Sequence, residues 1–171
     1  IKIKGIAIYK SKIYKDSRGY FAEIYKKKFL KKNLIFHCLS SSKKNVLRGL
    51  HLQTKNSQAK FITVVSGKIF DVAVDLRRNS KTFGNVFKIT LPYKSCNSIY
   101  IPEGFAHGFC GLNKNNIIYY CCSNYREKKH EVGILWNDKD LEIKWPIKDP
   151  ILSEKDKNNI TFKEYCDQYN K

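Results

Sequence analysis

The sequence predicts an all-β domain, and three observations carry that prediction. Short segments rich in Val, Ile, Phe and Tyr recur between residues 60 and 123. Turn-forming residues separate them at short intervals, which is typical of sandwiches and barrels rather than of parallel α/β sheets. A helix-start signal appears only near the C-terminus, where Ser153 precedes Asp156 by three positions. We therefore expect one domain over residues 1–171, built of strands and ending in a short helix.

The N-terminal part predicts isolated short elements. Residues 1–9 alternate in polarity like an edge strand, or like a strand swapped to a partner chain, and Asp16, Ser17 and Gly19 supply a turn. The elements expected next are a strand over residues 20–25, one or two helical turns over 26–33, a strand over 35–39 and a polar loop over 40–45.

The middle of the chain carries the densest strand pattern. Segments 60–65 and 68–76 are separated by Ser66-Gly67, which predicts a two-residue hairpin. Alternation in the second segment places apolar side chains on one face and two carboxylates on the other, namely Phe70, Val72, Val74 and Leu76 against Asp71, Ala73 and Asp75. Further strands are expected over residues 85–91, 98–101, 106–112 and 116–123.

The net charge of +18 does not by itself predict a nucleic-acid partner. Of the 33 basic residues only five are Arg, and the Lys are dispersed, as on a solvated surface. The charge suits a smaller acidic ligand such as a pyrophosphate. No apolar run reaches the roughly 18 residues of a membrane span, and the first residues lack the apolar core of a signal peptide. We therefore expect a cytoplasmic protein with six reduced cysteines and no membrane partner.

Five motifs occur in order along most of the chain: Arg48-Gly-Leu-His-Leu-Gln53, Gln58-Ala-Lys60, Phe70-Asp-Val-Ala-Val-Asp-Leu-Arg77, Ile101-Pro-Glu-Gly-Phe-Ala-His-Gly-Phe109 and Leu152-Ser-Glu-Lys-Asp156. Together they resemble the nucleotide-sugar 3,5-epimerases, the family typified by dTDP-4-dehydrorhamnose 3,5-epimerase. The resemblance implies a cupin-type jelly roll with short flanking helices. It also implies a homodimer whose N-terminal strands cross to the partner.

The resemblance further implies catalysis without a metal or any other cofactor, and the residues agree. A metal-binding cupin needs a His-x-His pair, a Glu shortly after it and a later His. Here His51 is followed by Gln53, and the next Glu in the sequence is Glu103. Two imidazoles, His51 and His107, make a poor closed site.

The implied reaction begins with removal of a proton from carbon. In a 4-keto sugar the carbonyl acidifies the hydrogens on C3 and C5, so a base can form an enolate and an acid can return a proton to the opposite face. The resemblance makes His51 the base, Asp156 the carboxylate that orients it and Tyr120 the acid. Tyr119 is the competing acid, because neighbours in a strand face opposite ways. A hydrogen-bonded barrel histidine and a packed aromatic are the alternative roles.

The remaining candidates surround the sugar nucleotide. By resemblance Lys60 lies near the ketone oxygen, with Asp71 as its expected partner. Arg48 matches a pyrophosphate contact, which suits its planar fork of donors. His107 is expected to order the interior. The other implied substrate residues are Gln53 and a nucleotide-binding segment contributed across the dimer, Arg18, Phe21 and Glu23.

The chain departs from the family pattern at two places. The family usually has Gln-Asp-Asn where this chain has Phe36, His37 and Cys38, and often has Tyr where this chain has Arg126. Both places surround the nucleotide or sugar and leave the catalytic trio unchanged. We therefore hypothesise a substrate with GDP in place of dTDP, such as a GDP-4-keto-6-deoxy-heptose used for capsule or lipopolysaccharide.

Four readings stay open at this stage. The chain inverts C3 and C5, or C3 alone, of a 4-keto-6-deoxy sugar; it is a dTDP-4-dehydrorhamnose 3,5-epimerase proper; it is a sugar-nucleotide 3,4-ketoisomerase; or it is a non-catalytic cupin that binds a sugar nucleotide. The motifs favour an epimerase.

Overall fold

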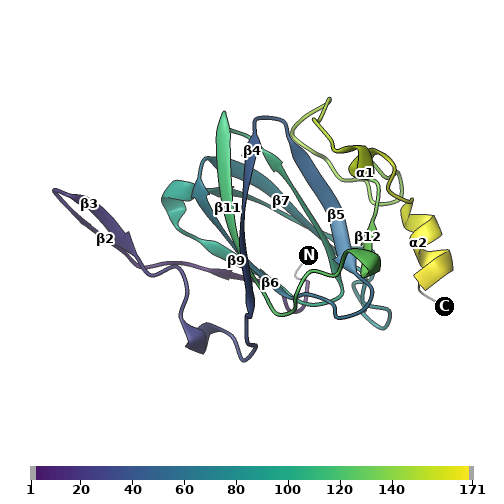
Figure 1. Ribbon diagram of the computed structural model, residues 1–171, viewed down its shortest axis with the longest axis horizontal. Helices are drawn as coiled ribbons and strands as arrows, with labels where there is room; N and C mark the ends of the chain where they lie inside the picture. The colour runs from purple at the N-terminus through teal and green to yellow at the C-terminus, as the bar shows by residue number, and fades with distance from the viewer. Residues whose placement is uncertain (1–2, 170–171) are drawn as a thin grey trace.

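Two five-stranded antiparallel sheets face one another in the computed structural model, which describes residues 3–169 (Figure 1). The first sheet has the order β1 (Ala7–Tyr9), β9 (Ser98–Ile101), β6 (Lys60–Ser66), β11 (Asn115–Cys122) and β4 (Phe36–Lys43). The second has the order β12 (Glu131–Gly133), β5 (Leu47–Gln53), β10 (Phe105–Gly111), β7 (Lys68–Asp75) and β8 (Val86–Pro92). The predicted all-β, cupin-type jelly roll is confirmed.

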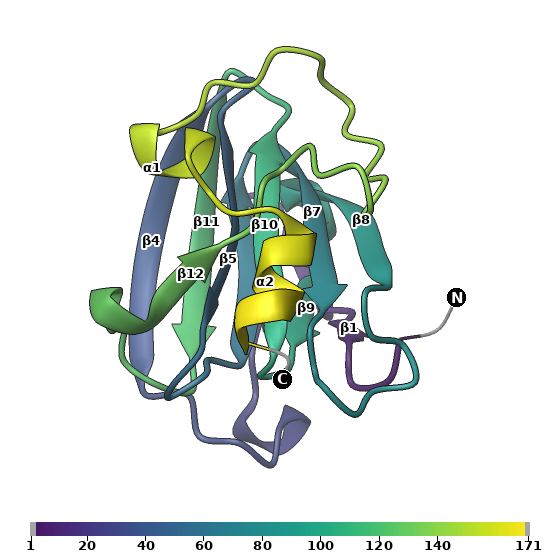
Figure 2. The ribbon, with the colours of Figure 1, turned by 90° about the vertical axis from the view of Figure 1, so that its right-hand side faces the viewer.

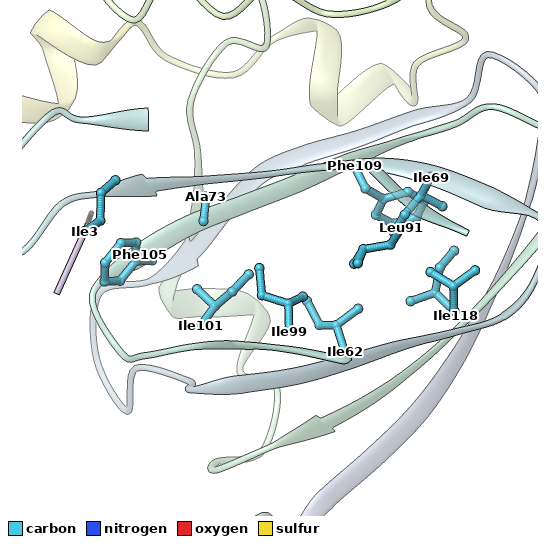
Figure 3. Packing of buried hydrophobic residues seen from close by; sticks show 11 residues of the cluster. Ile3, Ile62, Ile69, Ala73, Leu91, Ile99, Ile101, Phe105, Phe109 and Ile118 are labelled. Atoms are coloured by element: carbon cyan, nitrogen blue, oxygen red, sulfur yellow. The ribbon is translucent and has the colours of Figure 1, made fainter. Parts of the chain in front are cut away.

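The main core lies between the two sheets (Figure 3). Isoleucines of the first sheet, including Ile62, Ile99 and Ile118, meet Ile69 and Phe109 of the second. All five are almost completely buried. Burial of each such side chain contributes about 1.5–3 kcal/mol, so this layer is what holds the two sheets together.

The outer face of the second sheet is also covered. Val72, Val74 and Leu76 pack there against Leu141 and Tyr165 of the C-terminal segment. That segment includes α1 (Glu154–Lys157) and α2 (Phe162–Tyr169), and α2 lies across the second sheet (Figure 2). The predicted helix start is confirmed as α1, whereas α2 is an additional element. The structure describes no helix long and apolar enough to cross a membrane.

The hairpin predicted at Ser66-Gly67 is wrong, although both strands exist. β6 pairs with β9 and β11 in the first sheet, while β7 pairs with β8 and β10 in the second. The chain therefore passes from one sheet to the other at Gly67, whose φ is +82°. A Cβ there would lie 2.3 Å from the Asn115 carbonyl oxygen, so the corner needs glycine. A turn signal reports a change of chain direction, not which strands then pair.

The loop expected over residues 40–45 is also wrong in part, because β4 continues to Lys43. Ser40 pairs with Ile118 and Ser42 with Asn116 of β11. β4 is an edge strand, and one of its faces borders a cavity. Small polar serines suit both the solvent-exposed face and the cavity face. The polar composition of this segment therefore led to the wrong prediction of a loop.

The N-terminal segment behaves as an edge strand. β1 pairs with β9 of its own chain, while residues 1 and 2 of the expected element lie outside the described residues. The part that leaves the body is the next hairpin, β2 (Ile13–Asp16) and β3 (Gly19–Ala22), which projects to one side (Figure 1). The expected helical turns reduce to η1 (Lys27–Phe29); two further single turns are η2 (Tyr93–Ser95) and η3 (Lys128–His130).

Candidate active site

One cavity of about 330 Å³ gathers most of the predicted site residues. Its wall is built from β4, β5, β6, β10, β11, β12 and α1, so both sheets and the C-terminal segment contribute. The predicted residues that line it are His51, Tyr120, Asp156, Arg48, Gln53, Lys60 and His107.

His51 and Asp156 meet in this cavity although 105 positions separate them. His51 Nε2 lies 2.5 Å from Asp156 Oδ1, which is the predicted contact. The Ser153 hydroxyl accepts a hydrogen bond from the Asp156 amide at 3.1 Å and so caps α1. Burial alone would raise the pKa of Asp156, but the hydrogen bond and charge of His51 outweigh it and lower that pKa. The carboxylate is thereby held ionised beside the ring.

Close contact between β5 and β10 sets the position of His51. A Cβ on Gly49 would lie 2.5 Å from Gly108 Cα, and Gly49 has a φ of +123°. Only glycine fits that approach. His51 is then paired with His107 across the two strands, so two imidazoles stand side by side in the second sheet.

Glu131 is a site residue that the sequence reasoning missed. Its Oε1 lies 3.9 Å from His51 Nδ1, and its Oε2 lies 2.7 Å from Arg126 Nη2 and 3.1 Å from Lys155 Nζ. Burial would raise the pKa of Glu131, but Arg126, Lys155 and His51 lower it overall. Its place beside His51 depends on the pairing of β12 with β5, which no local pattern in the sequence indicates.

Tyr120, rather than Tyr119, lines the cavity. Tyr120 Oη is 3.1 Å from Ser40 Oγ, and its ring lies edge-on to His107 with 6.5 Å between centroids. Tyr119 points to the other side of the sheet, where its hydroxyl is 2.6 Å from His37 Nδ1. Burial raises the pKa of Tyr120 well above its ordinary value, so it is a neutral phenol at pH 7.

Asp71 is not joined to Lys60 as expected. Asp71 Oδ2 is 2.9 Å from His107 Nε2, and its Oδ1 is buried without a hydrogen-bond partner among the described residues. Alternation in β7 aims Asp71 inward, and β10 supplies the nearest donor because His107 lies on the adjoining strand. Burial lowers the pKa of the Lys60 ammonium, and within residues 3–169 no carboxylate lies within ion-pair distance of it.

Arg48 and Gln53 line the cavity in different states. Arg48 Nε donates to Ser42 Oγ at 3.0 Å and Nη2 donates to the Ser41 carbonyl at 3.2 Å, which leaves the Nη1 donors and one Nη2 donor without a protein partner. Gln53 has its amide fully engaged: Nε2 donates to the backbone carbonyls of Asn56 and Tyr125, and Oε1 accepts from the backbone of Glu127. Gln53 therefore braces the loop beside the cavity, and its role as a substrate contact stays a prediction.

Arg18, Phe21 and Glu23 lie outside the cavity of their own chain. Arg18 is paired with Asp16 at 2.6 Å, and Phe21 lies against Tyr14 in the projecting hairpin. Glu23, just after it, is paired with Lys26 at 2.5 Å. The expected role of this segment across a dimer stays a prediction.

The departures from the family pattern divide between two faces of β4. Phe36 and Cys38 line the cavity, and Arg126 lies at its rim. His37 faces away with Tyr119. Three of the four departures therefore change the cavity wall. Among the described residues, no group of three or more His, Cys, Asp and Glu is placed to hold a metal ion.

Comparisons with known proteins agree with this geometry. The family model described as dTDP-4-dehydrorhamnose 3,5-epimerase matches residues 1–164. A relative of that name from Shigella flexneri is 40% identical over 168 residues, covering 94% of this chain and 93% of its own. The crystal structure of such an enzyme from Elizabethkingia anophelis superposes with a TM-score of 0.90 at 40% identity, covering 96% and 94%.

A third similar protein was solved with a ligand. It is the epimerase of Legionella pneumophila in complex with dTDP-4-keto-L-rhamnose, with a TM-score of 0.90 and 36% identity over 94% of this chain and 89% of that one. The match spans nearly the whole chain in sequence and in fold. The chain is a nucleotide-sugar epimerase, and it belongs to the dTDP-4-dehydrorhamnose 3,5-epimerase family.

Proposed function

We propose that this protein inverts C3 and C5 of a dTDP-linked 4-keto-6-deoxy sugar through an enolate, with His51 as base and Tyr120 as acid. The observation that carries the proposal is the 2.5 Å contact of His51 with Asp156 in a cavity that Tyr120 also lines. A carboxylate on one ring nitrogen leaves the other free to take a proton from carbon. A neutral phenol can then return a proton to the sugar.

Lys60 is the group best suited to the enolate oxygen. Its side chain is half-buried at the cavity and has no ion-pair partner among the described residues, so no carboxylate competes for its charge. A buried cation aimed at developing negative charge stabilises a transition state more than the ground state. Arg48 at the same cavity is the expected pyrophosphate contact, because its unused donors form a planar fork.

The nucleotide we propose is dTDP rather than GDP. The relatives above are named for dTDP sugars, and the Legionella complex holds dTDP-4-keto-L-rhamnose. The earlier hypothesis of a GDP-linked heptose rests only on Phe36, Cys38 and Arg126, and none of these comparisons favours it. The use of the product in a surface polysaccharide, and a cytoplasmic location, remain predictions.

We further propose that the protein works as a homodimer. The projecting hairpin exposes Tyr20 and Phe21, at 55% and 65%, although large apolar side chains favour contact. Leu39 and Val65 are 66% and 50% exposed on the first sheet. A second copy that covers these side chains would bring the segment with Arg18, Phe21 and Glu23 to the partner's cavity. In that arrangement the hairpin, not β1, is exchanged.

Solvent exchange tests the proposal directly. The protein is incubated in D₂O with dTDP-4-keto-6-deoxyglucose, and deuterium at C3 and C5 is read by NMR. We expect exchange at both carbons, none with His51→Ala, and reduced exchange at one carbon with Tyr120→Phe. Exchange at C3 alone would make it a C3 epimerase; a product with its carbonyl moved to C3 would make it a ketoisomerase. Binding without exchange would make it a binding protein.

A panel of dTDP-, GDP- and CDP-linked 4-keto sugars tests the nucleotide. The expected result is the highest kcat/KM for the dTDP sugar. Full turnover of a GDP-linked sugar with none of the dTDP sugar would overturn the choice of nucleotide while leaving the chemistry intact.

A further inference from the structure

Glu131 connects the cavity's base to two cations at its rim. One carboxylate oxygen, Oε2, is held by Arg126 at 2.7 Å and by Lys155 at 3.1 Å. The other, Oε1, faces His51 Nδ1 at 3.9 Å. The Glu131 side chain is only 8% exposed, so water screens its charge poorly.

His51 therefore lies between two carboxylates that come from different elements. Asp156 on α1 takes Nε2, and Glu131 on β12 faces Nδ1, the nitrogen left to accept the substrate's proton. A carboxylate this close favours the protonated imidazole. A protonated imidazole has no lone pair with which to act as a base.

We propose that Arg126 is a positioning residue that acts on His51 through Glu131. Its guanidinium offsets the charge of Glu131 and holds the carboxylate on the rim side, which weakens the attraction of Glu131 for a proton on His51 Nδ1. This inference rests on the proposed role of His51 as base. It assigns a task to Arg126, one of the places where this chain departs from its family's usual residue.

Other charged and titratable groups also face this cavity, but an Arg126 variant leaves them in place. They are Lys155 and Asp156 from α1, Cys38 from β4, Arg48 from β5, Lys60 from β6, His107 from β10, and Tyr120 and Cys122 from β11. Arg126 forms its ion pair with Glu131. Because the Arg126 side chain is 52% exposed, solvent screens part of its charge, and its influence on His51 is expected to be moderate.

The direct test is an NMR titration of the His51 ring in the substrate-free protein. The signal is assigned by its loss in His51→Asn. We expect Arg126→Gln to raise the midpoint of the His51 titration by roughly 0.5 to 1 pH unit, because Glu131 is then less neutralised. Arg126→Lys should keep the midpoint near that of the wild type. Glu131→Gln should lower it.

The double variant Arg126→Gln/Glu131→Gln separates this mechanism from a general loss of charge. If Arg126 acts through Glu131, its substitution has little effect once Glu131 is neutral. Lys129→Gln is the matched control, since it removes an exposed cation two residues before Glu131 whose ion pair is with Glu127 instead. The control should leave the midpoint unchanged.

Activity gives the second readout. The acid limb of the kcat/KM profile for solvent exchange should move to higher pH in Arg126→Gln and return in the double variant. An unshifted midpoint in Arg126→Gln together with a raised KM would overturn the inference and make Arg126 a substrate contact. Absence of exchange in the wild type would instead overturn the proposed function, and the ring titration would still test the coupling of Arg126 to His51.

Discussion

Two imidazole–carboxylate pairs stand on neighbouring strands of the second sheet, and they have different surroundings. His51 with Asp156 and His107 with Asp71 are close in geometry, at 2.5 Å and 2.9 Å. The His51 side chain is 25% exposed to the cavity, whereas that of His107 is 5% exposed. Asp156 Oδ1 also accepts a hydrogen bond from Asn159 Nδ2, while Asp71 Oδ1 is buried without a partner among the described residues.

These surroundings are the reason why we propose His51, and not His107, as the base. Burial lowers the pKa of His107, against the opposing effect of Asp71, so its ring is neutral at pH 7 and closed off from solvent. It can order the interior but has little room to exchange protons. His51 has a second ring nitrogen without a close hydrogen-bond partner, access to the cavity, and a carboxylate partner that holds a second hydrogen bond from Asn159. Exposure of the ring to the cavity and the hydrogen bonding of the carboxylate, rather than the pairing itself, distinguish His51–Asp156 from His107–Asp71.

The largest expected effect comes from removing the accessible ring. His51→Ala should lower the rate of solvent exchange by about 10³-fold or more, because general-base catalysis is lost while the fold remains. His107→Gln, which can still donate to Asp71, should cost less than about tenfold. Exchange rates and thermal melting of both variants check this. Equal losses of activity in the two variants would contradict the assignment of the base to His51 rather than to His107.

The buried pair should matter more for stability. His107→Leu leaves the Asp71 carboxylate buried without a partner and should lower the free energy of unfolding by about 3 kcal/mol. Replacing both residues with Leu should cost less than the single change, because no buried charge is then left unpaired. Urea unfolding measures both variants. A double variant less stable than His107→Leu would argue against this account of the buried pair.

Asp156→Asn tests the contribution of the carboxylate to the His51–Asp156 pair. An amide cannot stabilise the imidazolium that forms on proton transfer, so kcat should fall by about 10²-fold with little change in stability. Ser153→Ala is the control: it removes the cap of α1, costs about 1 kcal/mol and keeps the carboxylate. A rate for Asp156→Asn no lower than that for Ser153→Ala would mean that Asp156 only anchors α1.

The smallest effect is the pH dependence of stability. The pKa of His107 is lower in the folded protein than in the unfolded chain, where it is about 6.5. Protons therefore bind more readily to the unfolded chain. The contribution of His107 to the free energy of unfolding is fully present above pH ~6.5. It declines as the pH falls below that value, and the total loss is about 1 kcal/mol.

The control for this prediction is His107→Gln, which should lack the decline between pH ~6.5 and ~5. Asp156 and Glu131 have lowered pKa values, so the stability that they add is lost only under more acidic conditions, below pH ~4. Denaturant titrations from pH 7.5 to 5 measure the difference. Identical slopes for the two proteins in that range would exclude His107 as the source.

Local patterns along the chain were enough to locate most strands and to point to the side chains of a known reaction. Alternation and turn residues located β7 to β11 within a residue or two, since both are properties of neighbours along the chain. The motif around His51 and the helix start at Ser153 were also visible. Their meeting was implied only by resemblance, because spacing cannot show contact across 105 positions.

The partners of the strands and of the charged side chains depend on how the whole chain packs. That packing sent β6 and β7 to opposite sheets, gave Asp71 to His107 instead of Lys60, and brought Glu131 beside His51. Strand pairing follows from burying apolar faces of the whole chain at once, and a charged side chain then binds whichever group that packing brings near. Local sequence does not contain that information, so the catalytic surroundings emerge only when the two sheets close.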